Sequence, residues 1–154
     1  KFFSPGFTIT NRQGDTIGRT DIYVNRSRDF PSTALENTSY ILVSAQSGER
    51  IATGVPAYND DVDVTKIQTY LIRPPLADRL IILLQGTDDK FIVHVKMNGT
   101  AVISGIDKDA SGTIKRLKRR SFSVDLSISD DTMLLCGIFL FTRYLLMENE
   151  PIIV

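Results

Sequence analysis

The sequence predicts a mainly β domain that closes around one hydrophobic helix near the C-terminus. Short segments alternate between apolar and polar residues with a period of two, and turn residues separate them, which is typical of sandwiches and barrels. Residues 130–147 hold the one long apolar run. A chain of 154 residues is long enough to bury the core of a single domain. We therefore expect one domain over residues 1–154, with strands between residues 7 and 128 and a central helix over 130–147.

The predicted strands are joined by polar turns that contain glycine, asparagine or proline. Asn98-Gly99 is the strongest hairpin signal, because both residue types accept a positive φ at the two central positions of a tight turn. Pro74 and Pro75 end one strand, since proline cannot continue a hydrogen-bonded ladder. The expected strands cover residues 7–10, 16–24, 39–45, 50–53, 64–72, 79–85, 90–97, 100–106, 113–117 and 121–128.

The apolar run near the C-terminus has the features of a buried helix. Ser129 is a suitable N-cap, and Asp130 and Asp131 suit the positive end of a helix. Apolar residues fall on every side, so protein or lipid must surround such a helix. Thr132 to Met147 would span about 24 Å, which is short of a bilayer core of about 30 Å. Arg143 also disfavours contact with lipid, and we expect it to find a carboxylate or backbone carbonyls, or to project from the end of the barrel.

Composition and motifs argue against an enzyme. The formal net charge is zero, so no global attraction to nucleic acid or to acidic surfaces is implied. Cys136 is the single cysteine, which we interpret as a small buried apolar residue, and His94 is the single histidine, which we place on a strand surface. The sequence contains no G-x-S-x-G elbow, phosphate-binding loop or dinucleotide fingerprint. We therefore expect no catalytic residues and no cofactor.

One segment concentrates positive charge. On a regular strand, Lys115 and Leu117 would share one face and three of the cations the other. Aligned cations can bind a phosphorylated lipid headgroup, and the alternative is a solvated outer face balanced by nearby acids. Nucleic acid is not expected, because aromatic residues are not interleaved with the charges. The candidate anion-binding residues are Lys115, Arg116, Lys118, Arg119 and Arg120.

No metal site is expected. Residues 107–114 resemble the first eight positions of an EF-hand loop, but the twelfth position, which should be a bidentate glutamate, is Lys118. We interpret this segment as a turn. The acidic residues at 59–63 and 88–89 are interpreted as solvated loop charges.

The last third of the chain resembles the tubby-like superfamily, especially its phospholipid-scramblase and LURP-one-related branches. The resemblance is carried by residues 91–106, by Lys108, Ser111-Gly112 and Lys115, by 122–126, and by Asp131, Met133 and the helix that ends near Glu148. Residues 7–19 also resemble the opening hairpin of these families. The resemblance implies a closed barrel of about twelve strands with the C-terminal helix through its centre.

The departures from this family narrow the expected function. Scramblases carry an acidic calcium-binding stretch and a cysteine cluster, whereas residues 115–121 are basic here and there is one cysteine. Tubby proteins bind phosphoinositide headgroups through surface lysine and arginine. The resemblance therefore implies a module that recognises anionic phospholipid or phosphoinositide. The missing catalytic motifs, the short helix and the single cysteine, which suits a reducing compartment, lead us to expect a non-catalytic protein in the cytoplasm that is peripheral to the membrane and not transmembrane.

Two other functions stay open. One is a protein-interaction scaffold, for which the basic segment is a solvated face. The other is a secreted effector or defence-type protein, suggested by glycosylation acceptor triplets at Asn25, Asn37 and Asn98.

Overall fold

The computed structural model describes residues 6–24, 38–57, 77–96, 98–105, 111–118 and 121–148. These residues form nine strands and one helix. The strands are β1 (Phe7–Thr10), β2 (Thr16–Val24), β3 (Thr38–Ser44), β4 (Arg50–Ala57), β5 (Arg79–Leu84), β6 (Lys90–Val95), β7 (Thr100–Ser104), β8 (Ser111–Lys118) and β9 (Ser121–Leu126), and the helix is α1 (Thr132–Glu148).

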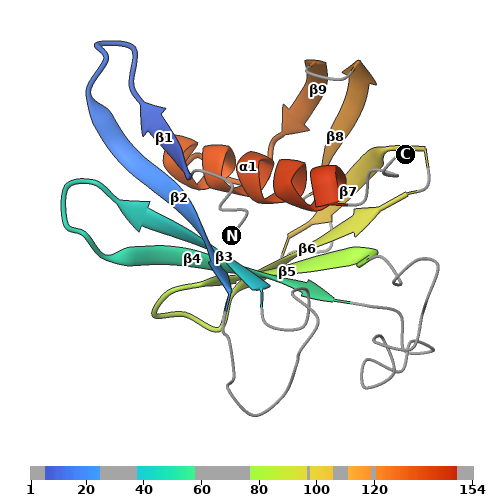
Figure 1. Ribbon diagram of the computed structural model, residues 1–154, viewed down its shortest axis with the longest axis horizontal. Helices are drawn as coiled ribbons and strands as arrows, with labels where there is room; N and C mark the ends of the chain where they lie inside the picture. Colours follow the sequence, from blue (N-terminus) through green and yellow to red (C-terminus); the bar gives the residue numbers. More distant parts are fainter. Residues whose placement is uncertain are drawn as a thin grey trace.

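Each strand pairs antiparallel with the next along the chain, so the sheet is a simple meander with β1 and β9 at its two edges. The sheet curls into a half-barrel, and α1 lies across its concave face (Figure 1). The predicted mainly β class and the C-terminal helix are confirmed. The strand predicted over residues 64–72 lies outside the described residues.

One strand is longer than its sequence suggested. β4 continues past Thr53 through Gly54 and Pro56 to Ala57. Pro56 is accommodated because the ladder from β4 to β3 ends at Gly54, while the ladder to β5 continues. A Cβ atom at Gly54 would lie 2.9 Å from the ring of Phe141, so glycine lets the helix approach this strand closely.

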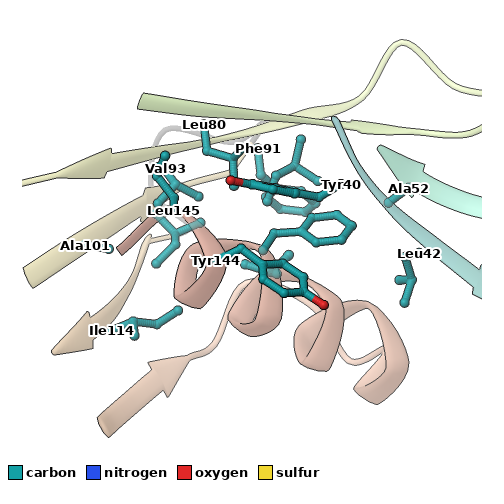
Figure 2. Packing of buried hydrophobic residues seen from close by; sticks show 14 of the residues in the cluster. Tyr40, Leu42, Ala52, Leu80, Phe91, Val93, Ala101, Ile114, Tyr144 and Leu145 are labelled. Carbon is teal, nitrogen blue, oxygen red and sulfur yellow. The ribbon is translucent and has the colours of Figure 1, made fainter. Parts of the chain in front are cut away.

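The core fills the space between the concave face of the sheet and α1. Figure 2 shows Tyr40 from β3 and Tyr144 from α1 among the aliphatic side chains of the neighbouring strands. The ring centroids of these two tyrosines are 5.2 Å apart, and those of Tyr40 and Phe141 are 5.8 Å apart. Such tilted aromatic pairs contribute to stability beyond the area they bury.

Buried hydrogen bonds connect α1 to β1 and β2. The Thr20 hydroxyl on β2 lies 3.2 Å from the Tyr144 hydroxyl, and it accepts a hydrogen bond from the backbone N–H of Phe7 at 3.3 Å. These bonds satisfy polar atoms that would otherwise be costly to bury. The register of β1, β2 and α1 is therefore fixed by polar contacts as well as by packing.

The helix begins two residues later than the sequence suggested. The Asp131 carboxylate accepts hydrogen bonds from the backbone N–H groups of Met133 (2.9 Å) and Leu134 (3.1 Å), so Asp131 is the N-cap. The predicted cap, Ser129, instead accepts a bond from the N–H of Asp131. The prediction of Ser129 as the N-cap is wrong because an aspartate nearer the apolar run performs the same role.

The helix is not enclosed equally on all sides by the described residues. The half-buried Cys136, Phe139, Leu140 and Arg143 recur at helical spacing along one stripe. Phe139 packs edge-on against Phe122 of β9, with ring centroids 5.5 Å apart. The concave face of the sheet covers the opposite stripe of the helix. The stripe with Phe139 and Arg143 instead contacts the two edge strands, β9 and β1.

Arg143 has an aromatic partner. Its guanidinium carbon lies 4.7 Å from the centroid of the Phe7 ring on β1. The sequence led us to expect a carboxylate or carbonyl partner, or projection from the end of the barrel; in the structure the half-buried Arg143 instead makes a cation–π contact with Phe7.

The turn between β6 and β7 has one residue more than predicted. Lys96 donates its backbone N–H to the Thr100 carbonyl at 2.8 Å, and Gly99 donates to the Lys96 carbonyl at 3.0 Å. Gly99 has a φ of 74°, and no described residue other than glycine has a positive φ. The expectation of positive φ at both Asn98 and Gly99 is therefore wrong; a three-residue loop ending in a left-handed glycine needs only one such residue.

Candidate anion-binding surface

The basic segment lies in the hairpin of β8 and β9, at one edge of the sheet. In Figure 1 this hairpin stands away from the part of the sheet that cradles α1. Alternation of burial along β8 places Gly112 and Ile114 on the concave face and leaves Lys115 exposed on the convex face. Strand β9 is exposed or half-buried throughout. The described residues of the hairpin are therefore exposed on its convex face.

A β-bulge changes which cations share a face. Arg116 pairs with Phe122, but Lys118 pairs with Ser121, so Leu117 is the additional residue on β8. Because directly opposed residues lie on the same face and Ser121 and Phe122 lie on opposite faces, Lys118 lies opposite to Arg116. Strict alternation predicted Arg116 and Lys118 together, and that expectation is wrong because of the bulge.

The result is that Lys115 and Lys118 lie on the convex face. Lys115 pairs with Ser123, and Lys118 pairs with Ser121, two residues away on the same strand. Arg116 is half-buried on the concave side, and its backbone N–H donates to the Gly99 carbonyl at 3.2 Å. Arg119 and Arg120, the other two predicted contacts, lie outside the described residues.

A third lysine joins this face from the neighbouring turn. Lys96 is hydrogen-bonded to Thr100, and Thr100 pairs directly with Lys115. Strands lie about 4.8 Å apart, so the backbone positions of Lys96 and Lys115 are separated by about 10 Å. We call the set Lys96, Thr100, Lys115, Lys118, Ser121 and Ser123 the basic surface.

Sequence reasoning missed Lys96. The Asn98-Gly99 turn predicted that the strands before and after it, β6 and β7, would pair. It gave no information on which strand would pair with the other edge of β7. The pairing of β7 with β8 brings Lys96 within two strands of Lys115, although they are 19 positions apart in the chain.

The lysines of the basic surface are exposed and lack carboxylate partners within the described part of the chain. Lys96, Lys115 and Lys118 are all exposed. The ion pairs between described residues are Arg19 with Asp21 on β2 and Arg79 with Asp78 at the start of β5, both outside the basic surface. Asp125 is the nearest acid along β9, in the next convex row opposite Thr113. The surface can therefore present ammonium and hydroxyl donors to one anion.

The structure places the other candidate groups away from the basic surface or within regular elements. His94 is exposed on β6 and Asp88 and Asp89 are exposed in the β5–β6 turn. Cys136 is half-buried, and burial raises the pKa of its thiol above the usual 9.0, which favours the neutral form. Ser111 already belongs to β8, so the second half of the EF-hand-like segment is strand. Groups of three or more metal-ligating side chains are not found among the described residues.

Within the described residues, no helix has both the length and the apolar character needed to cross a membrane. In comparisons with known proteins, no protein-family model matches the chain, and no curated protein or solved structure matches it either.

Proposed function

We propose that the chain is a non-catalytic binding module that recognises anionic phospholipid headgroups, phosphoinositides included, through the basic surface. The observation that carries the proposal is the row formed by Lys96 just after β6, Thr100 on β7 and Lys115 on β8, with Lys118 on the same face. Arg119 and Arg120 follow directly in the sequence and add to the local charge.

The energetics suit a peripheral and reversible interaction. Each cation near an anionic membrane contributes about 1 kcal/mol, so three lysines supply about 3 kcal/mol before other contacts. Such attraction weakens as salt rises, because the Debye length shortens. Hydroxyl groups of Thr100, Ser121 and Ser123 can add hydrogen bonds to phosphate oxygens, which gives the surface directional donors in addition to charge.

We further infer that the chain is a diverged tubby-like protein and that its barrel closes with about twelve strands. Support comes from the resemblance in residues 91–148 and from the antiparallel meander that curls around a C-terminal helix. Amide hydrogen exchange tests the closure. In a closed barrel the outward amides of β1 and β9 are protected, whereas rapid exchange at both edges would show that the barrel is open.

Vesicle flotation tests the lipid-binding proposal. A triple variant, Lys96→Glu, Lys115→Glu and Lys118→Glu, should lose binding to vesicles of phosphatidylcholine with phosphatidylserine or a phosphoinositide. The matched control carries Arg12→Glu, Arg50→Glu and Lys90→Glu, the same charge change at three exposed positions outside the basic surface. The control should keep most of the binding that the wild type shows.

Two results would overturn the proposal. Equal loss of binding in both triple variants would mean that overall charge, not the basic surface, governs attraction. Absence of wild-type binding at low salt would remove the lipid role, and the scaffold function with a protein partner would then be the better explanation of the exposed face.

A further inference from the structure

The most exposed of the large apolar side chains that the structure describes lies on β8 between two lysines of the basic surface. Leu117 is 59% exposed, compared with 46% for Val124, 45% for Leu83 and 39% for Val55. Single exposed apolar residues are common on proteins and need no special explanation by themselves. The position of Leu117 between Lys115 and Lys118 is what distinguishes it.

The bulge explains how a leucine comes to be exposed there. Leu117 is the additional residue between the pairs formed by Arg116 and Lys118, so it has no directly opposed partner on β9. The strand ends one residue later, at Lys118. Leu117 is therefore exposed next to the last residue of β8, without a directly opposed neighbour to cover it.

The chemistry around Leu117 matches the boundary of an anionic bilayer. Lysine side chains keep their ammonium groups at the headgroup level while their aliphatic stems lie along apolar material. An apolar side chain between such lysines can enter the region just below the headgroups and gain the free energy of leaving water. Charge draws the surface to the membrane, and the leucine adds a contribution that salt does not screen.

We propose that Leu117 inserts into the interfacial layer of an anionic membrane and that the last residues of β8, Leu117 with Lys118 beside it, face the membrane. This inference rests on the proposed lipid-binding function, for which it supplies the orientation. The occupant of the surface is a lipid bilayer, which offers both the anionic plane and the apolar layer that this arrangement of side chains needs.

The first test separates the apolar contribution from the electrostatic one. Leu117→Ser should weaken binding to phosphatidylserine-containing vesicles about tenfold and leave the salt dependence of binding unchanged. Substitution of Lys115 and Lys118 by glutamate should instead reduce the salt dependence itself. Leu83→Ser is the matched control, because Leu83 is also exposed and also lies opposite a lysine, Lys90.

The second test reports the location of the side chain directly. The chain contains no tryptophan, so Leu117→Trp and Leu83→Trp each introduce a single fluorescent reporter. With Leu117→Trp, vesicles should shift the emission to shorter wavelength and brominated lipid should quench it, while Leu83→Trp should show neither effect. Both variants should keep the circular dichroism spectrum of the wild type.

The outcomes distinguish this inference from the function on which it rests. Vesicle binding that depends on the three lysines, with no quenching at position 117 and no effect of Leu117→Ser, would overturn insertion and leave headgroup recognition in place. Absence of wild-type binding would overturn both, and capture of a protein by the same surface would then replace the membrane as its occupant.

Discussion

Strands β1 to β5 and the β8–β9 hairpin differ in how much they contribute to the buried core. Strands β1 to β5 contact α1 directly and contribute fully buried side chains such as Tyr40 and Leu80. The β8–β9 hairpin contributes Ile114 to the core, but most of its other side chains are exposed or half-buried. The buried core thus draws on strands β1 to β7 far more than on the β8–β9 hairpin, which carries exposed charge and an exposed leucine.

The largest difference should appear on truncating an aromatic residue on each side. Phe141→Ala should lower the free energy of unfolding by about 3–5 kcal/mol, because Phe141 is fully buried against Tyr40. Phe122→Ala on β9 should cost clearly less, since Phe122 is half-buried. Urea denaturation measures the free energy of unfolding of both variants. Equal losses would mean that the hairpin contributes as much to the core as the strands around Phe141.

Removal of the N-cap of α1 should lower the free energy of unfolding by an intermediate amount. Asp131→Ala removes the acceptor for two backbone N–H groups and should cost about 1 kcal/mol. Ser129→Ala should cost less, because Ser129 bonds to the N–H of Asp131, outside the helix. A larger loss with Ser129→Ala, measured by thermal or urea unfolding, would restore Ser129 as the cap.

The buried tyrosine should make stability depend on alkaline pH. Burial raises the pKa of Tyr144 above its usual 10.0, so the folded state holds this proton more tightly than the unfolded state. Above about pH 10 the unfolded chain loses the proton first, and the free energy of unfolding therefore falls as pH rises. Tyr144→Phe should cost about 1 kcal/mol near pH 7 through the lost Thr20 contact. As pH rises above about 10, the same variant should lose less stability than the wild type, and an unchanged pH profile would show that Tyr144 is not the source.

Substitutions of Leu117 and of the lysines on the basic surface should change the free energy of unfolding least. Leu117→Ser and the triple lysine variant should each change the free energy of unfolding by less than about 0.5 kcal/mol, since these side chains are exposed. Their effects should appear in vesicle binding instead. Urea unfolding of both variants provides the check, and a loss of several kcal/mol would mean that the hairpin supports the fold after all.

The sequence by itself determined the mainly β class, the nine described strands to within a few residues, and the C-terminal helix. These features follow from local causes: alternation with a period of two, turn residues such as Gly99, and a long apolar run preceded by polar residues suited to a helix N-terminus. Sequence also placed Lys115 and Lys118 in the candidate site, because clustered charge is visible without a structure.

The tertiary structure decided which side chains share a face and which strands are neighbours. The bulge at Leu117 exchanges the faces of the residues after it, and no local pattern in a charged segment signals where the pairing register will shift. Lys96 enters the basic surface only through the pairing of β7 with β8, and Arg143 finds Phe7 only because β1 lies beside the helix. Local propensity fixes elements one at a time, whereas a site assembled from several strands depends on register, which the packing of the whole sheet sets.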